Sequence, residues 1–160
     1  MRSAFDHDAS ARALVRRLKY DGVELAAAVL AEAMAPLLPA NSEVLVPVPR
    51  SLSRRVQFGI DQSFVLAKVV SRESGVPLAR LLAASPAHLA NAGRGKDRRR
   101  PPRFRALAGT TANVVLVDDV LTTGTTLRAA AGALGRGVVG AVTATRAMPW
   151  ANPRPTLGRR

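Results

Sequence analysis

Two adjacent carboxylates and a run of threonines stand close together near residue 120, and side chains of these types can do chemistry together. The stretch is Asp118, Asp119, Val120, Leu121, Thr122, Thr123, Gly124, Thr125 and Thr126. Backbone N–H groups and hydroxyls in such a glycine-containing loop can surround an anion. A bare phosphate would be repelled by the two acids, whereas vicinal hydroxyls can donate hydrogen bonds to them. The pattern therefore predicts a ribose 5-phosphate ligand, bound jointly by the acids and the loop.

The elements around this stretch must place both groups at one edge of a sheet. The run 114–117 is apolar and rich in β-branched residues, which is typical of a strand buried on both faces of a parallel sheet. We expect the strand to end at the two acids and a helix to follow the loop, with its positive end toward the anion. Ligands of open α/β sheets bind at the carboxyl ends of the strands. We therefore predict one Rossmann-like α/β domain over residues 1–150, with a parallel sheet and helices on both faces, and a loose tail over 151–160.

Other phosphate-binding motifs do not fit the same residues. A P-loop requires a Lys after its last glycine, and none follows Gly124. A dinucleotide fingerprint requires three glycines after the strand, and this loop has one. A simple alternative is a threonine that only caps the following helix, but capping explains one or two threonines and not four beside paired acids.

Two basic segments could contact further phosphate groups. A short strand over 44–48 leads into a loop with Arg50, Arg54 and Arg55, whose guanidinium groups match phosphate oxygens. A second loop, over about 84–105, holds seven Arg or Lys residues from Arg94 to Arg105 and is predicted to be a flexible basic lid. For both segments the alternative is a solvated surface loop, and the second could instead contact nucleic acid.

The remaining elements are predicted from periodicity and from turn residues. We expect a basic amphipathic helix over 10–20, an Ala/Leu-rich helix over 24–38 and a helix over 59–74 capped by Asp61. Strands are expected over 78–82 and 138–145.

Composition sets limits on the class of protein. The chain has 160 residues, a size near that of one domain, and its net charge of +13 favours anionic ligands, either a pyrophosphate or nucleic acid. It has no cysteine, which excludes disulfides and cysteine-ligated zinc. Its early apolar stretch, 25–38, is too short to span a bilayer, and its start does not resemble a signal peptide. We therefore expect a cytoplasmic protein.

The stretch from Val117 to Leu127 resembles the 5-phosphoribosyl-1-pyrophosphate (PRPP) signature of type I phosphoribosyltransferases. Further segments, over roughly residues 10–148, resemble the ComF branch of that family, which is associated with competence and DNA uptake. The matching segments are Leu18-Lys19-Tyr20, Val46-Pro47-Val48-Pro49 with Arg54 and Arg55 behind it, Asp61-Gln62, and Leu89 with Arg94 and Asp97 after it. The chain lacks the zinc ribbon with which ComF proteins commonly begin. Where the family usually has Arg-Gly-Phe-Asn-Gln, this chain has Phe58-Gly59-Ile60-Asp61-Gln62.

The resemblance implies a phosphoribosyltransferase, a pentosyl-group glycosyltransferase that releases pyrophosphate from PRPP. Asp118 and Asp119 would hold the ribose hydroxyls, and Thr122–Thr126 the 5-phosphate. Mg²⁺ would be carried on the pyrophosphate, and Arg54, Arg55 and Arg94 would be the catalytic cations that stabilise the leaving group. Two alternatives stay open: a PRPP or nucleotide sensor without turnover, and a protein associated with single-stranded DNA. The sequence identifies neither the acceptor nor the oligomeric state.

Overall fold

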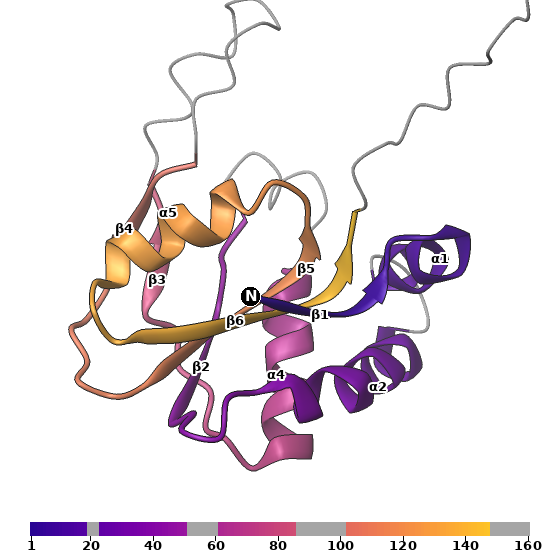
Figure 1. Ribbon diagram of the computed structural model, residues 1–160, viewed down its shortest axis with the longest axis horizontal. Helices are drawn as coiled ribbons and strands as arrows, with labels where there is room; N and C mark the ends of the chain where they lie inside the picture. The colour runs from indigo at the N-terminus through magenta and orange to yellow at the C-terminus, as the bar shows by residue number, and fades with distance from the viewer. Residues whose placement is uncertain (19–22, 51–60, 86–101, 148–160) are drawn as a thin grey trace, which may run out of the picture.

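A sheet of four parallel strands forms the centre of the molecule (Figure 1). The computed structural model describes residues 1–18, 23–50, 61–85 and 102–147. The strands are β1 (Arg2–Asp6), β2 (Val44–Pro47), β5 (Val114–Leu121) and β6 (Val138–Arg146), in the spatial order β1-β6-β5-β2. All three pairings are parallel, and a single parallel bridge joins Leu45 to Leu78 beyond β2. The predicted α/β class with a parallel sheet is therefore confirmed.

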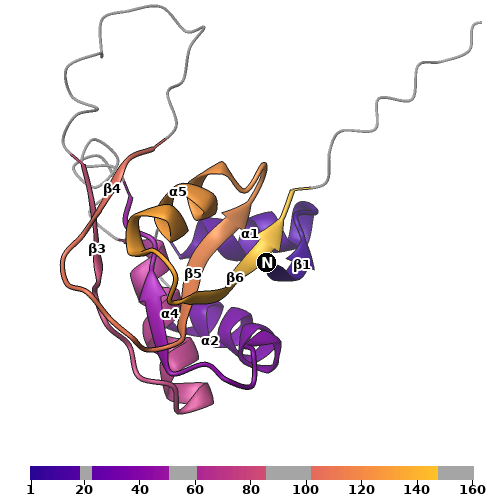
Figure 2. The same cartoon turned by 60° about the vertical axis from the view of Figure 1, so that its left-hand side comes forward.

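Helices cover both faces of this sheet (Figure 2). One face is covered by α1 (Ala9–Arg17), α2 (Val23–Met34) and α4 (Gln62–Ser74), and a short 3₁₀ helix, η1 (Ala35–Leu37), follows α2. On that face Leu30 and Leu66 pack with Val115 and Val117. The other face is covered by α5 (Thr125–Leu134), whose Leu127 joins the residues that pack there. Burial on both faces of the central strand is what its run of apolar residues predicted.

The strand that carries the two acids is longer than its sequence suggests. Val114 to Val117 are buried, as expected. The strand does not end at the acids, however, because β6 continues beside it and pairs Asp118 with Thr143 and Leu121 with Arg146. The expectation that the strand ends at Asp118 and Asp119 is therefore wrong, since β5 continues through Val120 and Leu121. A hydrogen-bonding neighbour, which a single stretch of sequence does not reveal, sets where a strand ends.

Two elements differ from the prediction. The strand expected over 78–82 is β3 (Leu82–Ala84), which pairs antiparallel with β4 (Phe104–Ala106), and only Leu78 reaches the main sheet. Thus the ends of the predicted basic loop, 84–105, are a two-stranded ribbon, and residues 86–101 lie outside the described part of the chain. Strand β1 was not predicted, because Arg2–Asp6 has no β-branched residues and depends on pairing with β6.

The helices agree with their predicted ranges to within a few residues. Helix α4 begins after Asp61, whose side chain accepts a hydrogen bond from the Phe64 N–H at 3.4 Å, so the predicted N-cap is confirmed. It ends at Gly75, which has a φ of +72°. In the described ranges, no helix combines the length and the apolar character needed to cross a bilayer.

Candidate functional site

Among the described residues, the acid pair has a strand neighbour on one side only, because β2 and β6 differ in length. Strand β2 ends at Pro47, opposite Val117, and the Val48 N–H makes a last hydrogen bond of 2.9 Å to the Val117 carbonyl. On the other side β6 accompanies β5 as far as Leu121. Beyond Val117, therefore, the described part of the chain places a strand beside β5 on the β6 side alone. This is the carboxyl edge, where ligands of α/β sheets bind.

The regular alternation of side chains along β5 changes phase at the two acids. Val115 and Val117 face the layer of α1, α2 and α4, while Leu116 faces α5. Strict alternation would turn residue 120 toward α5, yet Val120 packs in the first layer and Leu121 in the second. The shift between residues 117 and 120 brings the two carboxyl groups to one corner, where they interact with each other.

Asp118 is held by the start of α4. Its Oδ1 accepts hydrogen bonds from the Ser63 hydroxyl at 2.8 Å and from the Asp119 N–H at 2.9 Å. Burial, and next the negative charge of Asp119, raise the pKa of Asp118 to about 8, although the Ser63 hydrogen bond lowers it. Near neutral pH the raised pKa therefore favours the protonated, neutral form of Asp118.

Asp119 forms an ion pair with Arg50. Both side chains are 14% exposed, and the Asp119 carbonyl oxygen accepts a weak hydrogen bond from the Thr145 hydroxyl at 3.4 Å. The sequence placed Arg50 in the basic loop after β2 but selected Arg54 and Arg55 as the catalytic residues. The adjacency of β2 and β5 in the sheet, which the sequence does not reveal, is what brings Arg50 to Asp119.

The threonine loop passes directly from β5 into α5. Gly124 has a φ of +72°, a conformation that side-chain-bearing residues rarely adopt, and α5 begins at the next residue with no side-chain cap and no acid in its first turn. The Thr123 and Thr125 hydroxyls are 2.9 Å apart and hydrogen-bonded, and both residues are exposed, as is Thr122. Arg128 folds back and donates to the Thr123 carbonyl at 2.6 Å. The loop thus presents hydroxyls and an uncapped helix start, the groups that favour an anion.

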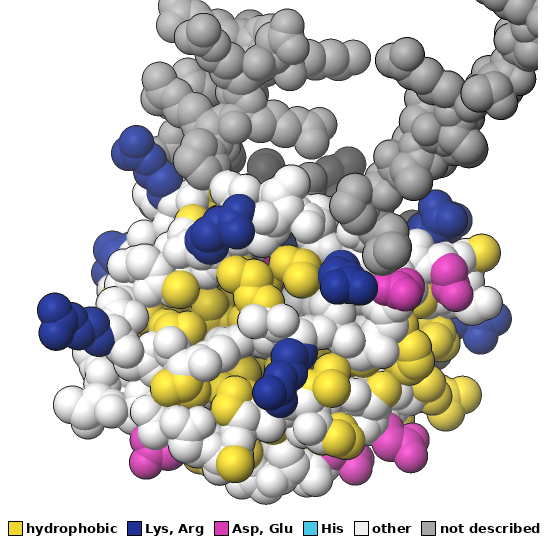
Figure 3. All heavy atoms as spheres, in the orientation of Figure 1, with side chains coloured by type: hydrophobic (Ala, Val, Ile, Leu, Met, Phe, Trp, Pro, Cys, Tyr) yellow, Lys and Arg dark blue, Asp and Glu magenta, His cyan; other side chains and the backbone are white. Residues whose placement is uncertain are grey.

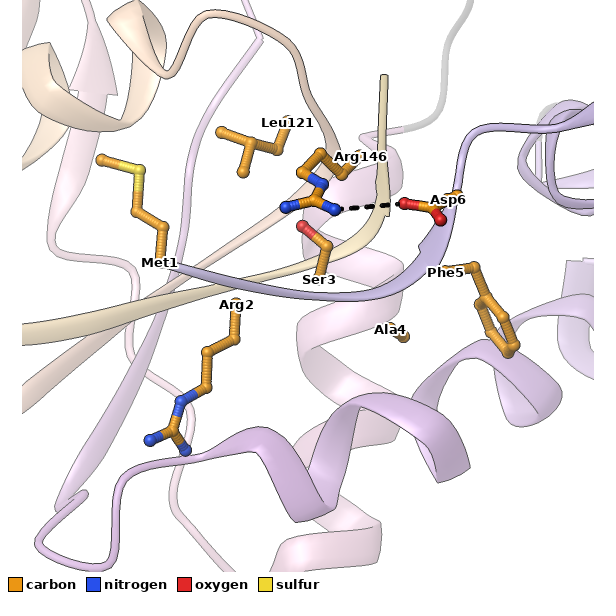
Figure 4. Close-up of a pocket in the computed structure, with 8 residues that line it drawn as sticks. All are labelled: Met1, Arg2, Ser3, Ala4, Phe5, Asp6, Leu121 and Arg146. Atoms are coloured by element: carbon orange, nitrogen blue, oxygen red, sulfur yellow. Dashed lines mark hydrogen bonds and ion pairs between the residues drawn. The ribbon is translucent and has the colours of Figure 1, made fainter. Parts of the chain in front are cut away.

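A cavity of about 320 Å³ borders this loop at Leu121 (Figure 4). It is lined by β1 together with Leu121 and Arg146. In Figure 4 Ser3, Leu121 and Arg146 lie on one side of β1, while Arg2 points to the other side, where it donates to the Leu37 carbonyl. Arg146 forms an exposed ion pair with Asp6 at 3.4 Å. Sequence reasoning missed most of this lining because it did not predict β1.

No family model matches the chain, and no curated protein matches it. Among solved structures, the chain is similar to the purine phosphoribosyltransferase from Pyrococcus horikoshii Ot3, with a TM-score of 0.42 and 19% sequence identity. The match covers 86% of this chain and 93% of that one. The fold class given above rests on the sheet order and on the two helical layers themselves.

Hydroxyl groups of β1 and β6 form hydrogen bonds beside β5, the strand that carries Asp118 and Asp119. Thr143 and Thr145 of β6 are both fully buried. The Ser3 hydroxyl lies 2.7 Å from that of Thr143, and Nδ1 of His7 lies 2.8 Å from that of Thr145. Thr145 also donates a hydrogen bond to the Asp119 carbonyl. These contacts therefore connect β1, through β6, to β5, the strand that carries the two acids.

The structure brings together part of the predicted site. Asp118 and Asp119 lie in one corner, and the loop from Thr122 to Thr126 follows on the same chain segment. Val120 packs into the core and Leu121 lines the cavity, so these two residues support the site through packing. Arg54, Arg55 and Arg94 lie outside the described residues, and their predicted role stays a prediction.

Proposed function

We propose that this chain binds PRPP, or a related ribose 5-phosphate, and transfers its phosphoribosyl group to an acceptor with release of pyrophosphate. The observation that carries the proposal is the acid pair and the hydroxyl-lined loop at the end of one strand, β5, followed by an uncapped helix. The resemblance of Val117–Leu127 to the PRPP signature supports the same ligand, and the resemblance to ComF proteins adds a proposed link to DNA uptake.

The chemistry of each group fits its proposed partner. Ribose hydroxyls would donate to the carboxylate oxygens of Asp118 and Asp119, and the 5-phosphate would accept from the N–H groups and hydroxyls at Thr122–Thr126. Carboxylate oxygens near a pyrophosphate are the ligand type that Mg²⁺ prefers, so the acid pair fits an ion carried on the pyrophosphate. The ion would supply positive charge against the departing pyrophosphate, and Arg54, Arg55 and Arg94 are proposed to add to it.

Pyrophosphate release tests the proposal directly. The protein is incubated with PRPP and Mg²⁺ and with each member of a panel of nitrogenous bases and amines, and pyrophosphate is measured with a coupled assay. We expect release with at least one acceptor and none when Mg²⁺ is chelated. If PRPP binds but no acceptor gives release, the protein is a PRPP sensor without turnover; if PRPP does not bind, the proposal fails.

A second candidate function is binding of single-stranded DNA, favoured by an asymmetry of surface charge. Helix α5 packs against the β3–β4 ribbon, and the described segments that form and flank these elements, 76–85, 102–113 and 122–137, carry exposed arginines and no acid. The arginines are Arg80, Arg103, Arg105, Arg128 and Arg136. In Figure 3 acidic side chains lie along the lower edge and at the right, while the upper left carries basic ones. Guanidinium groups without competing acids suit a phosphate backbone.

Salt dependence distinguishes this second function. Binding of a fluorescent single-stranded oligonucleotide should weaken with salt, and replacing Arg103 and Arg105 together by Gln should reduce the slope of log K against log salt by roughly 1.4, because two phosphate contacts are lost. Fluorescence anisotropy measures this, with Arg16 and Arg17 of α1, both exposed, replaced by Gln as the matched control. Equal slopes in both double variants would exclude the ribbon as the binding surface.

A further inference from the structure

Arg50 is ion-paired with Asp119 at the start of the basic loop that follows β2. Strand β2 ends at Pro47, the Val48 N–H is fixed to the Val117 carbonyl, and Arg50 follows two residues later. Its guanidinium contacts Asp119, and with each side chain only 14% exposed the pair is largely withdrawn from solvent. Arg50 is therefore anchored close to both the acids and the loop.

Both carboxyl groups of the site have a protein partner without any ligand. Asp118 accepts a hydrogen bond from the Ser63 hydroxyl, its raised pKa favours the neutral form, and Asp119 is ion-paired with Arg50. Ribose hydroxyls would have to compete with the guanidinium for Asp119. If Arg50 left Asp119 without finding another anion, two partly buried charges would be unpaired at high cost. A ligand that needs Asp119 must therefore also supply a new anionic partner for Arg50.

We propose that Arg50 makes this site discriminate a pentose phosphate that carries a pyrophosphate from one that does not. This inference rests on the proposed function. When PRPP binds, Arg50 exchanges Asp119 for the pyrophosphate oxygens, which its fork of donors matches, and Asp119 becomes free to accept the ribose hydroxyls. Ribose 5-phosphate offers Arg50 no such partner, so Arg50 stays on Asp119 and the sugar binds weakly.

The experiment compares the dissociation constants of Mg²⁺–PRPP and ribose 5-phosphate, measured by isothermal titration calorimetry on the full chain. In the wild type we expect PRPP to bind much more tightly. In Arg50→Gln, PRPP should bind more weakly while ribose 5-phosphate binds as well or better, so that the preference for PRPP falls at least tenfold. Arg50→Lys keeps the charge but not the fork, and it should restore part of the preference.

Matched variants separate this role from a structural one. Arg72→Gln removes an exposed arginine near the end of α4 and should leave the preference unchanged. If Arg50→Gln does not fold, Arg50→Gln combined with Asp119→Asn leaves no charge unpaired and should show the same loss of preference. An unchanged preference in Arg50→Gln, or in the double variant that stands in for it, with both ligands still bound by the wild type, overturns this inference but not the proposed function. If the wild type binds neither ligand, the proposed function fails and this inference fails with it.

Discussion

Replacing Asp118 and Asp119 together by asparagine should abolish the rise in melting temperature that Mg²⁺–PRPP gives to the wild-type protein. A ligand that binds only the native state stabilises it by about 2.7 kcal/mol at a concentration 100 times its dissociation constant. Asparagine has nearly the shape of aspartate, but its NH₂ group donates and cannot accept a hydrogen bond from a ribose hydroxyl, and at position 119 the change also removes a negative charge. The measurement is differential scanning fluorimetry with PRPP titrated at fixed Mg²⁺.

The control for this double variant is Glu73→Gln, which removes one exposed acid from α4, away from the carboxyl edge of the sheet. Its shift with PRPP should equal that of the wild type. A full shift retained by the Asp118/Asp119 double variant would show that PRPP binds elsewhere, and the ribose assignment would be lost. Oligonucleotide binding by the arginines near α5 and the β3–β4 ribbon should survive the Asp118/Asp119 double change. The double variant therefore distinguishes the two candidate functions, because it should lose PRPP binding and keep oligonucleotide binding.

Stability of the ligand-free protein should fall as the pH rises from about 4 to about 8, because of Asp118. Its pKa is raised to about 8 in the native state, mainly by burial, against about 3.9 in the unfolded chain. Between these values the native state holds a proton that the unfolded state has released. The resulting contribution to the free energy of unfolding has its full value below pH 4. It decreases by up to about 1.4 kcal/mol per pH unit as the pH rises toward 8. Urea unfolding at several pH values measures it.

Asp118→Asn tests the assignment of this pH dependence. Asparagine is neutral at every pH, so the variant should lose the decline and should be more stable than the wild type at pH 8. The Ser63 hydroxyl can still donate to the amide oxygen, which keeps the packing of α4 comparable. If the wild type and Asp118→Asn give parallel curves from pH 4 to 8, another group is responsible for the decline.

The sequence predicted features that depend on neighbouring residues and missed those that depend on distant ones. The strand from Val114 and the N-cap at Asp61 follow from local pattern, and both are confirmed. Strand β1 exists because β6 pairs with it, and the acids lie within a strand because β6 continues beside them. No local pattern encodes either pairing.

The same limit applies to the site. Its acids and its threonine loop are consecutive in the sequence, so one motif was enough to find both. Arg50 and Ser63 are separated from the acids by 69 and 55 positions, and only the packing of β2 and α4 against β5 brings them there. The raised pKa of Asp118 likewise arises from burial, which a motif does not specify.

The position of Met1 has a practical consequence for any assay of this protein. A Cβ atom placed on Gly124 would lie 3.4 Å from the Met1 sulfur, so the Met1 side chain lies close to the threonine loop. Met1 also lines the neighbouring cavity. A purification tag joined ahead of this residue would emerge beside the loop and could obstruct it. Titrations and activity measurements therefore require material whose affinity tag is attached after Arg160 or has been cleaved away.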